Sequence, residues 1–256
     1  MAVALSNSER QEQILQILSR QQRISVGEIC AAFAVSEATA RRDLETLANL
    51  GKIQRIHGGA VLFRQAPPEA PILQRQREQA AEKMRIGLAA ASLIQDGETI
   101  FLGSGSTVLE VAHALRTRHL TVITNSLPVM NALAGLPNIH LISLGGELRQ
   151  SELSFIGHIT EQALQEVRAD KVLMGIRAIS LEHGLTNDYL PETLTDRAIL
   201  RIAREIILLA DHTKFGRVAT AFVAPLENIH TLITDAKTPA EFIQALRERG
   251  IRVIVT

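Results

Sequence analysis

The chain has 256 residues, of which 46% are hydrophobic and only 3% aromatic, and its 27 basic residues balance its 27 acidic residues. This composition excludes a disordered chain and a polycation, so any binding of nucleic acid must come from a local basic patch. The length suits a small module followed by a larger domain.

Neither secretion nor a membrane span is expected. The first ten residues lack the pattern of a signal peptide, and no segment approaches the roughly 18 uncharged apolar residues of a membrane helix. Cys30 is the only cysteine, so an intrachain disulfide cannot form. These features predict a cytoplasmic protein.

Two helices are predicted near the N-terminus. Residues 8–20 have an amphipathic helical pattern, with Ile14 and Leu18 on the inner face. Ser25 and Glu28 have the spacing of a capping box, which predicts the start of a short second helix that ends at Phe33. A turn at 34–35 follows.

The segment from Val35 to Gly59 has the pattern of a DNA-reading helix followed by a β-wing. Ser36 is a good N-cap, because its hydroxyl can accept from a free N–H of the first helical turn. The helix is expected to end at Leu50-Gly51, with glycine in the left-handed position. The apolar residues predicted to face the core are Ala40, Leu44 and Leu47.

The wing is predicted from two short strands. Residues 53–56 alternate like a strand, His57-Gly58-Gly59 form a turn, and residues 60–62 form the second strand. Three helices and a wing make a winged helix-turn-helix domain, which we assign to residues 1–63.

Several side chains of this domain are candidates for contact with DNA. Residues 41–64 contain five basic and two acidic side chains, a modest positive excess. Either Arg41 or Arg42 could read a guanine, worth about 1–3 kcal/mol of discrimination, and the sequence leaves open which one does. An alternative for Arg42 is an ion pair with Glu45 on a solvated helix face. The candidates are Ser36, Glu37, Thr39, Arg41, Arg42, Arg55 and His57, the last two expected on the DNA backbone or minor groove.

A change of composition marks the end of this domain. Residues 64–71 read RQAPPEAP, which is not expected to continue a helix or a sheet, and we assign residues 64–80 to a linker. One or two helices are predicted within residues 72–94.

Strands and helices then alternate, which predicts an α/β domain over residues 81–256 with a largely parallel sheet covered on both faces. Helices are expected near residues 108–115 and after Ser126. The predicted strands are Thr99–Leu102, Leu120–Thr124, Ile139–Leu144, Lys171–Met174, Glu205–Ala210, Thr231–Thr234 and Arg252–Val255.

Polar loops follow several of these strands. The loop 103–107 (GSGST) places glycines and hydroxyls at a helix start, where backbone N–H groups suit a phosphate. It is neither a Walker A loop nor a dinucleotide loop, and alone it could be a tight strand–helix turn. Because the carboxyl ends of parallel strands share one edge, we expect these loops to converge on one ligand. The candidate effector-binding residues are Gly103, Ser104, Gly105, Ser106, Thr107, Thr124, Asn125, Ser126, Gly145, Gly146, Glu192, Asp211 and Lys214.

Asp211 and Lys214 allow three interpretations: a general base with a charge stabiliser, two ligand-binding groups, or a plain loop ion pair. His212 is expected to face solvent. No spacing of side chains matches a metal site and no nucleophile motif occurs, so no metal, cofactor or catalytic residue is predicted.

These motifs together resemble the DeoR family of bacterial transcriptional regulators. The N-terminal match comprises Val35-Ser36, Thr39, Arg41-Arg42-Asp43-Leu44, Leu47, Gly51, Arg55 and His57-Gly58-Gly59-Ala60. The C-terminal match comprises Asp96-Gly97, residues 103–107, Thr124-Asn125-Ser126, Gly145-Gly146, Gly157, Gly184-Leu185-Thr186, Asp211 and Lys214-Phe215-Gly216. The resemblance implies an operator-binding repressor whose effector is a phosphorylated sugar or related metabolite, with a sensor domain like ribose-5-phosphate isomerase.

Two segments depart from the family pattern. Residues 175–179 (GIRAI) carry Arg and Ala where many members have a glycine-containing turn, and Asp196 stands where a Lys is frequent. We expect residues 187–197 to determine which ligand is chosen.

Three functions are compared. The first is a ligand-responsive regulator with an operator as partner, acting as at least a dimer because operators usually have two-fold symmetry. The second is a sugar-phosphate isomerase or deaminase with an accessory helical domain. For an isomerase the resemblance implies paired carboxylates after Met174, where this chain has GIRA. The third is an architectural DNA-binding protein without a ligand, and the polar loops argue against it.

Overall fold

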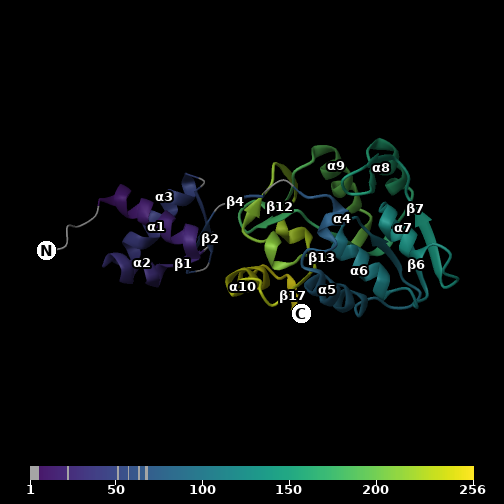
Figure 1. Ribbon diagram of the computed structural model, residues 1–256, viewed down its shortest axis with the longest axis horizontal. Coiled ribbons are helices and arrows are strands. Elements are labelled where there is room, and N and C mark those ends of the chain that lie inside the picture. The colour runs from purple at the N-terminus through teal and green to yellow at the C-terminus, as the bar shows by residue number, and fades with distance from the viewer. Residues whose placement is uncertain (1–5, 22, 51, 57, 63, 67–68) are drawn as a thin grey trace.

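The computed structural model describes residues 6–21, 23–50, 52–56, 58–62, 64–66 and 69–256. A small N-terminal domain of helices and a three-stranded sheet is joined to a larger α/β domain (Figure 1). In the described part of the chain, no helix combines the length and apolar character needed to cross a bilayer.

The second and third N-terminal helices begin at the caps that the sequence predicts. The backbone N–H of Glu28 donates to the hydroxyl of Ser25, and the Glu28 carboxylate accepts from the Ser25 N–H at 2.7 Å. The hydroxyl of Ser36 accepts from the N–H of Thr39. The helices are α1 (Asn7–Gln21), α2 (Val26–Phe33) and α3 (Glu37–Asn49). Their aliphatic core includes Ile14, Leu18, Ile29, Ala40, Leu44 and Leu47.

The wing has one strand more than the sequence predicts. Its strands are β1 (Arg23–Ser25), β2 (Ile53–Ile56) and β3 (Gly59–Leu62), with β3 pairing antiparallel to both of the others. The approach of β1 explains Gly59, because a Cβ there would lie 2.2 Å from the carbonyl oxygen of Ile24. The predicted turn residue His57 and the predicted helix-ending Gly51 lie outside the described residues.

The prediction that residues 64–71 cannot join a sheet is wrong at the start of this segment. The strand β4 (Arg64–Gln65) pairs in parallel with β14 (Arg217–Val218), and the N–H of Ala66 donates to the carbonyl of Val218 at 2.9 Å. The prolines of the segment all come after residue 66, so they do not remove the N–H groups that this pairing uses. In Figure 1, β4 lies at the neck between the two domains.

The larger domain is built on a seven-stranded sheet in which all neighbouring strands run parallel, as predicted. In order across the sheet the strands are β17 (Arg252–Val255), β16 (Thr231–Thr234), β13 (Ala203–Leu209), β10 (Ala169–Gly175), β5 (Thr99–Leu102), β6 (Leu120–Thr124) and β7 (Ile139–Ser143). The chain adds β6 and β7 on one side of β5 and then returns to place β10 on its other side. The direction of strand addition therefore reverses between β5 and β10.

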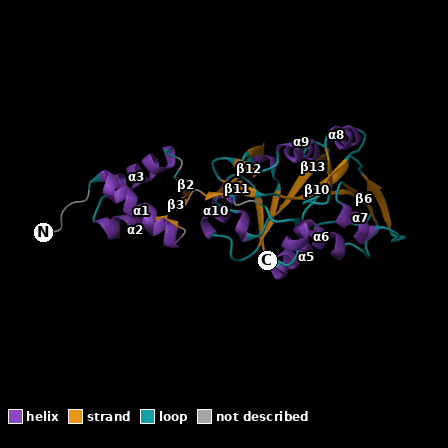
Figure 2. Ribbon diagram, turned by 45° about the horizontal axis from the view of Figure 1, so that its top comes forward, coloured by secondary structure: helices purple, strands orange, loops and turns teal. Residues whose placement is uncertain are grey.

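Helices cover both faces of this sheet (Figure 2). Alternate side chains of β5 divide between two cores, with Ile100 and Leu102 in one and Phe101 in the other. Helices α5 (Ala80–Ala91), α6 (Ser106–Ala114) and α7 (Leu127–Leu133) contribute to the first core. Helices α8 (His158–Gln165), α9 (Leu190–Ile199) and α10 (Ala240–Glu248) contribute to the second. The helix predicted near residues 108–115 begins two residues earlier than expected.

The larger domain also contains short elements, outside the main sheet, that the sequence does not predict. The strands β8 (Glu147–Arg149) and β9 (Ser154–Ile156) form a hairpin. A second small sheet consists of β11 (Ala178–Ser180), β12 (Gly184–Asn187) and β15 (Ala221–Ala224). The 3-10 turn η1 (His212–Lys214) is also unpredicted, whereas the short helix α4 (Ile72–Arg75) and α5 are the helices expected within residues 72–94.

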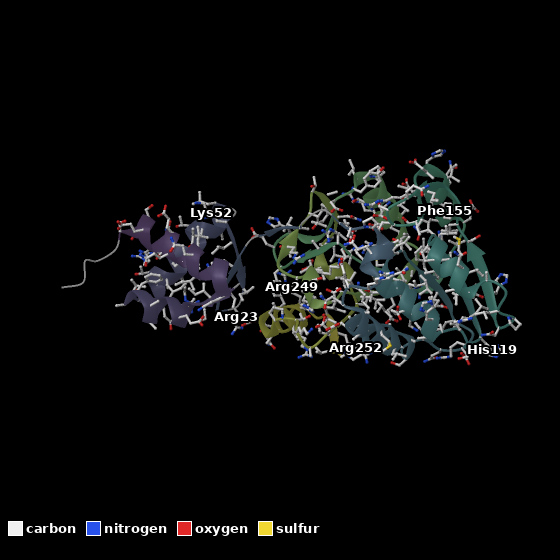
Figure 3. All side chains as sticks on the ribbon, viewed as in Figure 1. Arg23, Lys52, His119, Phe155, Arg249 and Arg252 are labelled. Atoms are coloured by element: carbon white, nitrogen blue, oxygen red, sulfur yellow. The ribbon has the colours of Figure 1, made fainter. Side chains whose placement is uncertain are left out.

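The two domains touch through the wing and α10. The guanidinium of Arg23 forms an ion pair with Glu241 at the start of α10, and Ile56 of β2 belongs to the apolar core of the larger domain. Figure 3 labels Arg23 and Arg249 on the two sides of this junction.

Candidate functional site

The exposed face of α3 carries the first group of candidate residues. Ser36 Oγ lies 3.0 Å from Thr39 Oγ1, so both hydroxyls sit at the helix start. Arg41 forms an exposed ion pair with Glu37, with Nη2 and Oε2 3.1 Å apart. Arg42 is exposed, and the described residues contain no ion pair between it and Glu45. The solvated-pair alternative for Arg42 is therefore not seen.

Arg55 lies in a different environment from the α3 arginines. Its side chain lines a groove between the wing and the larger domain, together with Glu182, Glu248 and Arg249. In this arrangement Arg55 lies at the junction of the two domains. It can contact DNA only if the bound DNA extends from α3 as far as this groove. His57 is outside the described residues.

A polar cavity lies at the carboxyl ends of β5 and β10. Its lining includes residues 104–108, which join β5 to the first turn of α6, and residues 175–177 at the end of β10. Strand order reverses between these two strands, which is where open α/β sheets bind their ligands. The loop leads into α6, whose N-cap is Gly105 with φ +117° and no side-chain cap bond. Residues 106–108 of the first turn line the cavity, so the start of α6 and its uncapped N–H groups lie beside it, as in anion-binding helix starts.

Cationic side chains from separate elements converge in this cavity on one carboxylate, that of Glu69 in the linker. Its Oε1 lies 3.0 Å from Nη1 of Arg75, 3.6 Å from Nη1 of Arg177 and 3.5 Å from Nζ of Lys214. The ammonium of Lys83 also lines the cavity and donates to two backbone carbonyls of residues 75 and 78. Burial lowers the pKa of Lys214, and the nearby Glu69 and Asp211 oppose that shift.

A second part of the cavity is acidic. Glu152 accepts two hydrogen bonds from the guanidinium of Arg75, and Glu192 forms an ion pair with Arg149 and accepts from Ser154 at 3.1 Å. The amide of Asn187 donates to Asp196 at 2.9 Å.

The protonation of these acids is shifted toward the neutral form. Burial raises the pKa of Glu152 to about 7, with Arg75 opposing the shift. Burial also raises the pKa of Glu192, and it raises the pKa of Asp196 well above its usual value, with Glu192 adding to the effect. Neutral acids and an amide can both donate to and accept from hydroxyl groups.

The cavity is small in this arrangement. Its volume is about 60 Å³, whereas pockets that hold small ligands measure about 300–1,000 Å³. The paired side chains of Glu69, Arg75 and Glu152 line the space that remains.

Both domains match known families. Residues 10–66 match the DeoR-like helix-turn-helix domain, and residues 78–236 match the DeoR C terminal sensor domain. The chain belongs to the DeoR family. The resemblance noted in the sequence is thereby confirmed, and DeoR-family proteins are DNA-binding transcriptional regulators.

Several relatives are similar over almost their whole length. The glycerol-3-phosphate regulon repressor of Escherichia coli (strain K12) is 34% identical, covering 97% of this chain and 99% of the relative. The HTH-type transcriptional repressor GlcR of Bacillus subtilis is 35% identical, covering 97% and 96%. The HTH-type transcriptional regulator IolR of Bacillus subtilis is 32% identical, covering 90% and 92%.

Among solved structures, the chain is similar to ribose 5-phosphate isomerase A from Methanocaldococcus jannaschii. The match covers 54% of this chain and 55% of the isomerase, with 18% identity and a TM-score of 0.41.

Six of the predicted effector-binding residues of this DeoR-family chain line the cavity. They are Ser104, Gly105, Ser106, Thr107, Glu192 and Lys214. The lining does not include Gly103, Thr124, Asn125, Ser126, Gly145, Gly146 and Asp211.

Some residues outside the lining have clear roles within the protein. The hydroxyl of Thr124 donates to the carbonyl of Leu102, and the carbonyl of Gly145 accepts from the hydroxyl of Thr160. Asp211 accepts from the N–H of Thr213 and so caps η1. The described residues contain no ion pair between Asp211 and Lys214, because Lys214 pairs with Glu69 instead.

His212 is only partly exposed and does not line the cavity, so the expectation that it faces solvent holds in part. Its Nδ1 lies 3.0 Å from both carboxylate oxygens of the buried Asp235, and 23% of the side chain is exposed. Asp235 follows β16, the strand beside β13, so the pairing depends on sheet order and could not be read from the local sequence.

The sequence did not predict seven polar residues of the lining as site residues. They are Glu69, Arg75, Lys83, Glu152, Arg177, Asn187 and Asp196. Only a weak signal was available for some of them: Arg177 and Asp196 are the two departures from the family pattern, and Asn187 begins the segment expected to choose the ligand.

Proposed function

We propose that this chain is a repressor of a sugar-metabolism operon, and that a phosphorylated sugar or a related metabolite modulates its binding to the operator. Residues 1–63 read double-stranded DNA, residues 64–80 connect the domains, and residues 81–256 sense the effector. Because it acts on DNA, we expect it in the cytoplasm. The relatives described as repressors support this proposal.

The main support for an effector site is the cavity at the ends of β5 and β10, where the direction of strand addition reverses. Arg75, Arg177 and Lys214 surround one position for an anion, and the start of α6 adds backbone N–H donors beside it. Charge-assisted hydrogen bonds of this kind suit a phosphate. The neighbouring acids Glu152 and Glu192 suit the hydroxyl groups of a sugar.

The DNA-binding part of the proposal rests on the exposed face of α3. We propose Ser36, Thr39, Arg41 and Arg42 as the residues that contact the operator, with Glu37 orienting Arg41. One copy carries only a modest positive excess, so pairing of at least two copies supplies the affinity for a symmetric operator.

Regulation requires that the effector bind two arrangements of the domains with different affinity. The wing and α10 are in contact through Arg23 and Glu241 in the arrangement seen here. We propose that effector binding in the cavity shifts this arrangement and thereby the spacing of paired winged helices.

One observation favours an enzyme as the second candidate. Glu152 has a pKa raised to about 7, the range in which a carboxylate serves best as a general base at neutral pH. Its oxygens are however held by Arg75, and residues 175–178 lack acids. We therefore propose that the protein binds its ligand without converting it.

The test uses the full-length protein. A thermal-shift screen against a panel of phosphorylated sugars identifies a ligand, since a ligand stabilises the state that it binds. Binding to DNA from upstream of the protein's own gene cluster is then measured with and without the hit, while NMR of the recovered sugar detects turnover. Operator binding that responds to the hit, with the sugar recovered unchanged, is expected. Absence of operator binding with and without sugar phosphates contradicts the proposal, and conversion of the sugar favours the enzyme.

A further inference from the structure

The segment between the domains places a side chain inside the cavity. Glu69 is the only acid in residues 64–71, and it comes between β4, which pairs with β14, and α4. Its side chain is 9% exposed. A linker carboxylate that served only solubility would face water, so its burial among cations needs an explanation.

The cations around Glu69 come from elements that are far apart in the sequence. Arg75 ends α4, Arg177 follows β10, and Lys214 ends η1. Buried cations are costly without a counter-charge. Arg75 also pairs with Glu152, and Arg177 also pairs with Asp188 at 3.1 Å. Glu69 is the carboxylate that all three cations share, and a phosphate dianion in its place would bring two negative charges and more acceptor oxygens.

Glu69 also fills space that a ligand needs. The cavity of about 60 Å³ holds roughly two water molecules. A sugar phosphate can enter only if side chains leave, and Glu69 is the lining residue that lies in the segment between β4 and α4. Its departure would vacate the position between Arg75, Arg177 and Lys214.

We propose that Glu69 is a built-in competitor of the effector: the anionic group of a phosphorylated ligand takes over Arg75, Arg177 and Lys214 and expels the Glu69 side chain. This inference rests on the proposed function and names the anion subsite and the step that couples it to the linker. The Glu69 carboxylate and the phosphate cannot both occupy the position between Arg75, Arg177 and Lys214, so ligand binding and the inserted linker exclude each other.

The segment that carries Glu69 joins the cavity to the DNA-binding domain. The wing strand β3 ends at Leu62, and β4 begins two residues later beside β14. Figure 1 shows β4 at the neck between the domains. Expulsion of Glu69 removes the anchor that follows β4, which leaves the hydrogen bond from Ala66 to Val218 less protected and frees the wing to change its position.

The competition has a measurable cost for the ligand. The apparent affinity of a ligand is reduced by the fraction of molecules in the competent state. If the Glu69 carboxylate is paired with these cations in about nine molecules of ten, its removal strengthens the binding of the ligand about tenfold.

The experiment compares wild type with Glu69→Gln, which keeps the shape of the side chain and removes its charge. Inorganic phosphate is titrated calorimetrically at pH 8 in sulfate-free buffer, and exchange of the amides in residues 64–72 is followed by mass spectrometry. Glu166→Gln is the matched control, because Glu166 is an exposed acid at the end of α8 and does not line the cavity. Glu69→Ala is the second variant.

We expect Glu69→Gln and Glu69→Ala to bind phosphate about tenfold more tightly than wild type or Glu166→Gln. Phosphate should speed exchange at Ala66 in wild type, and the Glu69 variants should exchange fast without phosphate. Equal or weaker phosphate binding by the Glu69 variants overturns the competition, even where the sugar-phosphate screen has found an effector for wild type. A screen without any effector contradicts the proposed function instead, so the two failures are distinguishable.

Discussion

The guanidinium of Arg10 in α1 lies 2.5 Å from the carboxylate of Asp43 in α3, and both side chains are buried. Gln11 donates to the other carboxylate oxygen of Asp43 at 3.1 Å. This pair ties the inner side of α3 to α1, while Arg41 and Arg42 lie on its outer side. The orientation of the DNA-reading helix therefore depends on a buried charge pair as well as on its apolar core.

Replacing Asp43 by Asn should destabilise the N-terminal domain by about 3 kcal/mol, because a buried guanidinium would lose its counter-charge. Hydrogen exchange of the full-length protein measures this directly: amides of α1 and α3 should exchange faster, and those of the seven-stranded sheet should not. Glu45→Gln is the control, since Glu45 is an exposed acid of the same helix. Equal protection of α3 in both variants would contradict a stabilising role for the pair.

Removing the arginines of α3 should weaken operator binding and flatten its dependence on salt, by about 0.9 in the log–log slope for each DNA phosphate that is no longer neutralised. Arg41 is already paired with Glu37, whereas no acidic partner of Arg42 occurs in the described ion pairs. Arg42→Ala is therefore expected to have the larger effect of the two single variants, and the double variant the largest.

The measurement is a titration of operator DNA at several salt concentrations. Arg204→Ala removes an exposed arginine of the larger domain and should leave the slope unchanged. A slope that stays the same in the double α3 variant would argue against phosphate contacts by this pair.

The main sheet could be predicted because each of its strands is a short apolar run between polar loops. All seven predicted strands are present, and the alternation with helices correctly indicated a parallel sheet with two covered faces. The shorter strands were missed for a physical reason. Strands such as β1 and β4 are only three and two residues long, and they form because a partner edge from elsewhere in the chain is available, which local composition does not record.

The cavity was predicted only in part, for a similar reason. The loop 104–107 and Lys214 could be found because each follows a strand and carries suitable polar groups. Glu69 and Glu152 reach the cavity from the linker and from the β8–β9 turn. Their approach depends on how these segments fold back over the sheet, and no periodicity in the sequence encodes it.

Lys214→Met should weaken effector binding about 10- to 100-fold, because the anion loses one charge-assisted hydrogen bond in a buried site. Operator binding without effector should persist, since Arg75 and Arg177 still hold Glu69. Calorimetry with the sugar phosphate found in the screen, together with operator titrations, tests both parts. Lys237→Met serves as the control, because Lys237 is 63% exposed and does not line the cavity. An unchanged effector response would remove Lys214 from the site.

Glu152 should make the stability of the protein depend on pH in a defined direction. Its pKa is raised from 4.5 to about 7 in the folded state, chiefly by burial, so the folded protein holds this proton more tightly than the unfolded chain. The resulting contribution to stability is fully present below pH 4.5 and is lost as the pH rises through about 7, with a size of about 3 kcal/mol. Glu152→Gln imitates the protonated form and should lack this loss.

The variant is therefore expected to match wild type near pH 5 and to be more stable at pH 8, because its amide oxygen can still accept from Arg75 without a buried negative charge. Thermal unfolding of both proteins across this range gives the comparison, and only the difference counts, since Glu192 and Asp196 shift both curves in the same direction. Glu147→Gln is the control, because Glu147 is an exposed acid of the same hairpin. Its curve of stability against pH should run parallel to that of wild type. If the Glu152→Gln curve also runs parallel to wild type, the carboxyl is ionised throughout this range, and the acidic part of the cavity faces the ligand as a fixed negative charge.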